Sequence, residues 1–389
     1  MNTISWNEAR HFTWDAIVIG AGCAGAIVAR QLAKGGRRAL LVDRAQFPRY
    51  KVCGCCLGTA AQETLASIGL GNLLTTSGAV KTNAMIAASA GRRVRIPLPD
   101  YAVLSRERLD LELVQSAIDE GVSFLPGTTA KREQSPVEHQ VVSLRCADES
   151  VKATGKIIIA ADGLGGGLME ERHQARLRMT RSRVGAGAVS IAAPLAYEPG
   201  VVYMACGRAG YVGVCRLEDG RTTIAAAMDV AFVKDSQGLA NAARRLLNDA
   251  GFSTIPDIND IVWKGTPLLT QRPAAVAGHR TFLVGDSAGY VEPFTGEGMK
   301  WALTSAVALA PIASAASENY SREHEHAWRM AHRNVVSSRT RTCIALSAAL
   351  RRPWIVSAAI RVISIRPGVA GPFVRKINAP VSIQKGIHP

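Results

Sequence analysis

One short segment near the start of the chain restricts the fold more than any other. An apolar run at residues 16–19 is followed by Gly20, Gly22 and Gly25 in the spacing G-x-G-x-x-G, and then by helix-forming residues 26–33. The first glycine of this spacing makes a tight turn, the second lets a pyrophosphate approach the backbone, and the third allows close helix packing. The segment therefore predicts a strand, a turn and a helix that bind a dinucleotide, with the helix N-terminus at the phosphates.

A second apolar run at residues 39–42 completes a βαβ unit, and Asp43 follows it. A carboxylate in this place can accept hydrogen bonds from the hydroxyls of the adenosine ribose. Because both flanking strands and the acid are present, a chance glycine-rich turn is the less favoured interpretation. Further cofactor contacts are expected from residues next to these positions, namely Cys23, Ala24 and Arg44.

A second glycine-rich segment narrows the choice of dinucleotide. The apolar strand 281–284 leads into G-D-S-A-G at 285–289, and residues 293–298 read P-F-T-G-E-G before a helix expected over 300–311. This pattern resembles the flavin-contacting signature of the FAD-dependent enzymes that include aromatic hydroxylases, flavin halogenases and geranylgeranyl reductases. The resemblance implies that Asp286 holds the ribityl chain or the pyrophosphate and that the helix N-terminus faces the flavin pyrimidine. It also implies cofactor contacts at Gly296, Glu297, Gly298 and Met299.

Two shorter segments resemble the same superfamily. Residues 104–110 read L-S-R-E-R-L-D, similar to its R-x-x-L-D element, which implies that Arg106 approaches the cofactor. Residues 157–163 read I-I-I-A-A-D-G, but Gly165 stands where that superfamily has serine. The glycines that follow are interpreted as a turn, because the third-glycine spacing is missing and Asp162 would face a phosphate. No dedicated nicotinamide domain is expected.

A cysteine-rich loop discriminates among the subfamilies. Residues 47–58 read F-P-R-Y-K-V-C-G-C-C-L-G, which resembles the F-P-R-x-K-x-C-G-G-x-L stretch of geranylgeranyl reductases, whereas the halogenase W-x-W-x-I-P signature is absent. The resemblance implies that the loop passes close to the isoalloxazine, with cofactor contacts at Lys51, Cys53 and Gly54. Cys55 departs from the family glycine. The thiols are either small buried hydrophobes or, as the sharper hypothesis, catalytic groups that adjust the flavin, with Cys53 and Cys55 the candidates. C-x-C-C is poor spacing for zinc, so no metal is expected.

The order of these segments predicts an α/β fold: a Rossmann-type FAD-binding domain with an inserted antiparallel-sheet substrate domain and a C-terminal helical region. Alternating stretches between residues 182 and 263, with a hairpin turn at Asp219-Gly220, predict the antiparallel sheet, and 236–250 is expected to be one helix. The expected FAD-binding domain comprises residues 1–75, 102–165 and 266–318. The substrate domain comprises 76–101 and 166–265, and the basic helical region comprises 319–389.

The positive charge of the chain gathers at its end. Lys plus Arg number 46 against 31 acids, and residues 326–389 hold nine arginines, two lysines and no acid, a formal charge of +11. The remainder is nearly balanced, so nucleic acid is not an expected partner. The arginines beside Trp354, Ile355, Ile360 and Ile363 fit either a solvated helix face, an anionic membrane surface or an acidic carrier protein. No long uncharged apolar run predicts a spanning helix. Eight cysteines without a regular framework suggest reduced thiols, hence a cytoplasmic protein, with peripheral membrane attachment as the alternative.

The predicted function is that of an FAD-dependent oxidoreductase acting on a hydrophobic small molecule, with NADH or NADPH as electron donor. The geranylgeranyl reductase-like loop favours reduction of a double bond in a prenyl or polyketide-like substrate. The superfamily at large keeps a second hypothesis open, hydroxylation of an aromatic or polyketide-like ring by a monooxygenase. A third hypothesis, from another class, is a non-catalytic electron-carrier flavoprotein.

Overall fold

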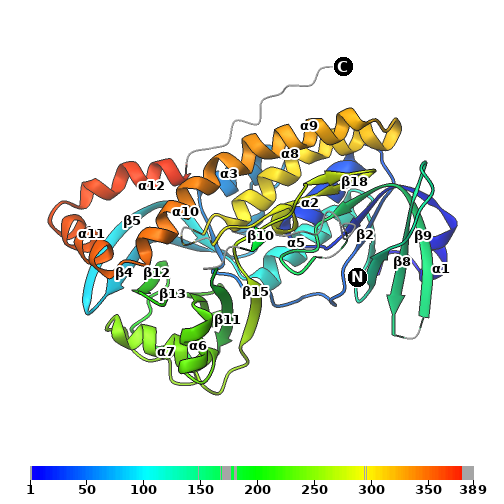
Figure 1. Cartoon of the computed structure of the whole chain (residues 1–389). Helices are drawn as coiled ribbons and strands as arrows, with labels where there is room; N and C mark the ends of the chain where they lie inside the picture. The colour runs from blue at the N-terminus through cyan, green and yellow to red at the C-terminus, as the bar shows by residue number, and fades with distance from the viewer. Residues whose placement is uncertain are drawn as a thin grey trace.

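The computed structural model describes residues 2–147, 149–166, 168, 177–178, 182–292, 294 and 296–378. Two eight-stranded sheets and a set of helices make up this part of the chain (Figure 1). A short antiparallel pair, β10 and β16, joins Leu177–Arg178 to Gln271–Arg272.

The first sheet contains the parallel strands that the glycine motifs predict. Its path is β17-β18-β9-β1-β2-β6, and β1 lies in register between its parallel neighbours, with Ile17 opposite Leu40 and Ile158. The strand bounds are β1 Thr13–Ile19, β2 Ala39–Val42, β6 Ser123–Leu125, β9 Glu149–Ala160, β17 Ala277–Gly278 and β18 Thr281–Leu283, with β7 Thr129–Arg132 and β8 Gln140–Cys146 as an antiparallel extension of β9. The carboxyl ends of β1, β2, β9 and β18 therefore meet at one edge, where ligands bind in open α/β sheets.

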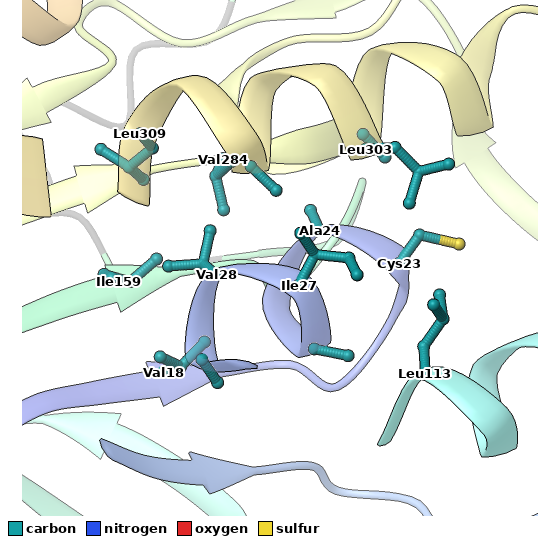
Figure 2. Packing of buried hydrophobic residues seen from close by; sticks show 14 of the residues in the cluster. Val18, Cys23, Ala24, Ile27, Val28, Leu113, Ile159, Val284, Leu303 and Leu309 are labelled. Carbon is teal, nitrogen blue, oxygen red and sulfur yellow. The ribbon is translucent and has the colours of Figure 1, made fainter. Parts of the chain in front are cut away.

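Helices α2 (Cys23–Lys34), α5 (Arg106–Asp119) and α8 (Gly298–Glu318) cover this sheet. Figure 2 shows Ile27 and Val28 of α2 between the strand residues Val18 and Ile159 and the α8 residue Leu309, all of them buried. The helix expected over 300–311 is longer than predicted. It continues through Pro311 to Glu318, because the residues beyond the proline, such as Ile312 and Ala313, are buried in the same core. The shorter helices of this half are α1 Trp6–His11, α3 Thr59–Ser67 and α4 Leu73–Thr76.

The second sheet has the order β15-β11-β14-β13-β12-β4-β5-β3, and every pair except β4 and β12 is antiparallel. Its strands are β3 Cys56–Leu57, β4 Val80–Ser89, β5 Arg92–Val103, β11 Val184–Ser190, β12 Val201–Gly207, β13 Gly210–Arg216, β14 Thr222–Met228 and β15 Lys264–Leu268. The predicted antiparallel insertion is thus present. The sheet also includes β3, because Cys56 pairs with Val103, so its membership crosses the expected segment boundaries.

The helix expected over 236–250 begins three residues later than predicted, and a short helix that was not predicted precedes it. Helix α6 (Val230–Asp235) ends before Gln237 and Gly238, which have φ values of 59° and 130°, and α7 (Leu239–Asp249) begins after them. The left-handed backbone at these two residues ends the first helix, and Gly238 tolerates it without a side-chain clash. Helix α7 then packs its buried alanines and leucines on β12 and β13.

The C-terminal helices pack on different parts of the molecule. They are α9 Arg322–His332, α10 Ser338–Leu350, α11 Pro353–Ile365 and α12 Ala370–Asn378, with a π-helical turn between α9 and α10. Helix α9 lies on α8 and β17 of the first half, whereas α11 and α12 lie on strands of the second sheet. Helix α11 packs across β4 and β5 (Figure 1). Its residue Ile360 belongs to the same buried cluster as Val94 and Ile96. In the described ranges, α8 is long and apolar enough to cross a membrane, but 78% of its most apolar window is buried. The end of α10 and α11 together pass the same test as a pair bent by 102°.

A buried ion pair ties these layers together. Arg183, just before β11, is completely buried and donates to Glu292 at 2.8 Å, and its Nε lies 3.4 Å from Asp229. Asp229 also accepts from Arg351, at the end of α10, at 2.8 Å. One carboxylate therefore joins the second sheet to the C-terminal helices.

Removing the arginine alone should be costly. Arg183→Ala leaves the buried Glu292 carboxylate without its cation, so we expect unfolding to become easier by about 3–5 kcal/mol. The double variant Arg183→Met with Glu292→Gln removes both charges, so it should regain part of that loss. Urea unfolding followed by circular dichroism measures both. Equal losses in the single and double variants would show that the ion pair is not the cause.

Candidate functional site

The two sheets and the C-terminal helices enclose one continuous cavity of about 2560 Å³. Single ligand pockets commonly measure roughly 300–1,000 Å³. The volume therefore exceeds what one small molecule needs and is compatible with a dinucleotide plus a second ligand. One end of the cavity lies at the carboxyl edge of the first sheet, against the glycine turn and Asp43.

The glycine turn shows two different uses of glycine. A Cβ atom on Gly25 would lie 1.8 Å from the carbonyl oxygen of Gly20, so this glycine allows α2 to pack on the turn. A Cβ atom on Gly22 would instead lie 3.4 Å from Nη2 of Arg49 and 3.6 Å from Nη2 of Arg106. Gly22 is also the N-cap of α2, and no side chain caps that end of the helix. Space, guanidinium groups and helix amides thus meet at one place, an arrangement suited to a phosphate.

Two carboxylates hold these cations in position. Asp43 accepts hydrogen bonds from the amides of Ala21 at 2.8 Å and Ala45 at 2.9 Å. The fully buried Asp110 accepts two hydrogen bonds from Arg106, at 3.0 and 2.8 Å. Arg49 bridges the two carboxylates, with Nη2 at 3.3 Å from Asp110 and 3.6 Å from Asp43.

The residues present fit FAD. Nε of Arg49 is buried and has no hydrogen-bond partner among the described residues, so a donor is left for an anionic ligand. Lys51 lies 3.3 Å from Asp286 at the same edge. Cations, helix amides and carboxylates match the phosphates and hydroxyls of a dinucleotide. Within the described ranges, no group of three or more His, Cys, Asp or Glu residues could hold a metal ion.

Most of the cofactor contacts expected from the sequence line the cavity. They are Gly20, Gly22, Cys23, Ala24, Asp43, Arg44, Lys51, Cys53, Gly54, Arg106, Asp286, Gly296, Gly298 and Met299. Two expected contacts lie elsewhere. Gly25 packs against Gly20, and the buried Glu297 forms an ion pair with Lys300 and accepts from Cys343 at 3.2 Å. Burial raises the pKa of the Cys23 thiol to about 12, so this contact stays protonated.

The cysteine loop forms a cluster of thiols around Gly54. The amide of Cys55 donates to Sγ of Cys53 at 3.4 Å, and Cys56 and Cys215 both donate to the Gly54 carbonyl, at 3.1 and 3.6 Å. Cys55 has φ 59°, the left-handed conformation that a glycine adopts freely and that costs other residues roughly 1–2 kcal/mol. Cys55 therefore adds a thiol where geranylgeranyl reductases have glycine, while its backbone keeps the left-handed conformation that glycine favours.

The thiols of Cys53 and Cys55 differ in acidity. Hydrogen bonding with Cys55 lowers the pKa of Cys53 to about 6 against the opposing effect of burial, and the charge of Arg106 acts in the same direction as the hydrogen bond. The same hydrogen bond, together with burial, raises the pKa of Cys55 well above its usual range. Cys53 is therefore the more acidic thiol of the pair, and Cys55 keeps its proton.

The other end of the cavity is apolar. We call it the apolar arm. It is lined on the sheet side by Met85, Ala87, Val94, Ile96 and Leu98, and on the helix side by Leu346, Leu350, Ile360, Ile363 and Val374. Between the two ends, Tyr211, Tyr290 and Phe294 line the wall, with the rings of Tyr211 and Phe294 edge to face at 5.1 Å.

Sequence reasoning missed several of these residues. Arg49 stands inside the recognised F-P-R segment, so its charge was a signal that could have been used. Cys215 gave no signal, because it reaches Gly54 from β13, across the second sheet. The apolar arm also gave none, since its walls come from β4, β5 and the C-terminal helices, which are far apart in the sequence.

Known proteins resemble the chain over most of its length. The sequence model of the FAD binding domain family matches residues 13–324. Menaquinone reductase of Mycolicibacterium smegmatis is 28% identical over 331 residues, which cover 79% of this chain and 78% of the relative. Digeranylgeranylglycerophospholipid reductase 3 of Methanosphaera stadtmanae is 24% identical over 330 residues, 79% of this chain and 80% of the relative. A triple mutant of the flavin-dependent brominase Bmp2 superposes with a TM-score of 0.77 over 96% of each chain at 14% identity, a likeness of fold.

The glycine at the start of α2 provides a direct test of the cofactor site. Gly22→Val should place a branched side chain beside Arg49 and Arg106, where a phosphate would lie, so the purified protein should lose most of its yellow flavin. Gly35→Ala at the other end of the same helix is the control, because its Cβ meets only ordinary contacts at 3.4 Å. Flavin absorbance per protein measures both. Full flavin content in Gly22→Val would place the phosphates elsewhere.

The acidity of Cys53 can be measured by alkylation. Because the thiolate is the nucleophile, labelling of Cys53 by iodoacetamide should rise as the pH passes through about 6. Arg106→Met removes the positive charge, so the midpoint should move to higher pH. Peptide mapping by mass spectrometry gives the extent at each site, with the half-exposed Cys146 on β8 as the internal reference. An unchanged Cys53 profile in Arg106→Met would mean that the guanidinium does not act on the thiol.

Proposed function

Because the chain belongs to the FAD binding domain family, we propose that it uses reduced FAD to reduce a carbon–carbon double bond in a hydrophobic substrate that carries a prenyl chain. The observation that carries the proposal is the apolar arm, which continues from the cofactor end of the cavity. Residues of two strands and three helices line it. An aliphatic chain is the ligand that such walls solvate best.

The relatives support the reductive direction. Two proteins that match about four fifths of the chain are named as reductases, one of menaquinone and one of digeranylgeranylglycerophospholipid. The cysteine loop at residues 47–58, which resembles that of geranylgeranyl reductases, points the same way.

When bound, FAD supplies the hydride chemistry of the reaction. The α2 N-terminus and Arg49 would hold the phosphates, and Asp43 would accept from the ribose hydroxyls. Lys51 and Asp286 neutralise each other at the first sheet's edge and position the loop that carries Cys53. These groups are held by the fold in advance, so binding needs little reorganisation.

The paired cysteines and two buried tyrosines determine which side chains beside the cofactor site are protonated. Cys53 is the more acidic of the two thiols, so its thiolate would lie near the positive charge of Arg106, and Cys55 stays protonated next to it. Burial raises the pKa of Tyr211 and Tyr290 well above the usual range, so both phenols stay protonated and can donate hydrogen bonds. In the proposed mechanism, the thiolate adjusts the electrostatics around the flavin, and the aromatic wall excludes water from the reacting bond.

Product analysis tests the reaction. The holoenzyme is reduced without oxygen by dithionite or by NADH or NADPH, the proposed donors, and is then mixed with a lipid extract of its own cell. We expect the flavin to reoxidise and one lipid to gain two hydrogens by mass. A product that gains oxygen, formed only in air, would instead identify a monooxygenase. Flavin that stays reduced with every lipid fraction would favour an electron carrier.

A pair of variants shows whether the apolar arm holds the substrate. Ile360→Trp should fill part of the arm and slow reduction at least tenfold while leaving the flavin content unchanged, because Ile360 is buried against the arm. Ser364→Trp, one turn further along α11 and exposed, is the matched control.

A further inference from the structure

Helix α11 is apolar on both sides. Its inner side packs on β4 and β5 through residues such as Val356 and Ile360. Its outer side leaves Trp354, Val362 and Ile365 exposed by 70%, 49% and 72%, and Val369 just beyond the helix by 53%. These four residues and the exposed Ala358 recur at intervals of three or four, so they form one stripe, which we call the apolar strip. Contiguous exposed apolar residues of this kind mark an interaction surface.

Arginines flank the apolar strip. Arg352, Arg361, Arg366 and Arg375 are all exposed. No acidic residue occurs between 326 and 389, so nothing on these helices neutralises them from within the same segment. Arg351 is different, because it is engaged with Asp229 at 2.8 Å. The exposed arginines therefore surround an apolar centre, the distribution that fits the boundary between lipid headgroups and acyl chains.

The cavity reaches the same surface. Trp354, Ala358, Val362 and Val369 belong to the apolar strip and also line the cavity. They are continuous with Ile360 and Ile363, which line the apolar arm. The arm thus opens at the apolar strip. An apolar opening does not stabilise a water-soluble substrate. A lipid chain, in contrast, could pass through it while remaining in apolar surroundings.

We propose that the apolar strip and its arginines bind an anionic lipid bilayer and that the substrate's chain enters the apolar arm from that bilayer, past α11. The entry route rests on the proposed function, whereas bilayer binding does not. An acidic carrier protein would match the charge of the arginines but not the exposed Trp354 and Ile365 of the apolar strip. An anionic bilayer matches both the charge of the arginines and the apolar character of the strip.

Vesicle flotation of the holoenzyme tests the binding. We expect it to float with vesicles of phosphatidylglycerol and phosphatidylcholine, to float poorly with phosphatidylcholine alone, and to be released at high salt. Arg361→Gln with Arg366→Gln should weaken binding about 30-fold, from roughly 1 kcal/mol for each arginine near an anionic surface. Arg10→Gln with Lys34→Gln, exposed charges elsewhere, is the matched control and should bind like the unmodified protein.

A second pair of variants tests the strip itself. Trp354→Ser with Ile365→Ser should abolish flotation, whereas Leu195→Ser, at a leucine that is 98% exposed on another part of the surface, should not. The emission of Trp354 is the part of the fluorescence that is lost in the variant Trp354→Phe. We expect vesicles with brominated acyl chains to quench this part, because the proposal places the Trp354 ring among the acyl chains. Flotation that is insensitive to the strip variants, equal binding to neutral vesicles, or no quenching of Trp354 would each overturn the proposal.

The outcomes separate this proposal from the reaction. Absence of flotation under every condition would eliminate the bilayer and leave an acidic protein as the partner of the arginines, while the product assay in lipid extract could still succeed. Normal flotation with no reduction of any lipid would instead contradict the proposed function. If both hold, the strip variants should lose reduction of lipid in vesicles but regain it in detergent micelles, where the substrate no longer needs to come from a bilayer.

Discussion

The close approach of α2 to the end of β1 is the constraint on which the rest of the cofactor site depends. At Gly25 and Gly20 the helix and the turn approach so closely that a single added carbon would meet a carbonyl oxygen at 1.8 Å. At Gly20, a Cβ would also meet the carbonyl of Ala161, after β9, at 2.3 Å. Helix, turn and neighbouring strand are therefore fixed together at the edge of the sheet. This fixes where the α2 amides are placed and gives α8 the surface on which it packs.

The ionic groups around that edge act by position more than by net charge. Arg49, Arg106, Asp43 and Asp110 balance one another, so the network as a whole adds no large positive potential. Its effect is to hold two guanidinium groups beside Gly22 while Asp43 is ordered by two backbone amides. A buried carboxylate such as Asp110 is tolerable only because it receives several donors, and the arginines that supply them, Arg49 and Arg106, also line the cavity.

How much of this could be predicted from the sequence depends on whether a contact is local. The βαβ unit and the edge residues Gly20, Gly22, Asp43 and Asp286 follow from short motifs, because a strand that ends in a glycine turn sets its own geometry. The start of α7 after Gly238, three residues later than expected, could not be predicted, since only the backbone angles of Gln237 and Gly238 show where the helix begins. Glu297 was placed at the cofactor by resemblance, but its side chain turns to Lys300, a neighbour one helical turn away. The approach of Cys215 to the cysteine loop and the apolar arm could not be foreseen, because the segments that form them meet only after the second sheet has folded.

The arginines of the C-terminal region have two different roles in the structure. Arg351 is part of the framework, because Asp229 accepts from it and also lies beside the completely buried Arg183. The arginines that follow it in the chain have the opposite character, since they are exposed around apolar side chains that a folded protein in water would be expected to cover. Helix α11 is thus anchored at its start and on its inner side, while its outer side is left apolar at the mouth of the cavity. A helix held in this way can present the mouth to a surface without losing its own packing, because the contacts that fix it do not involve the residues that such a surface would touch.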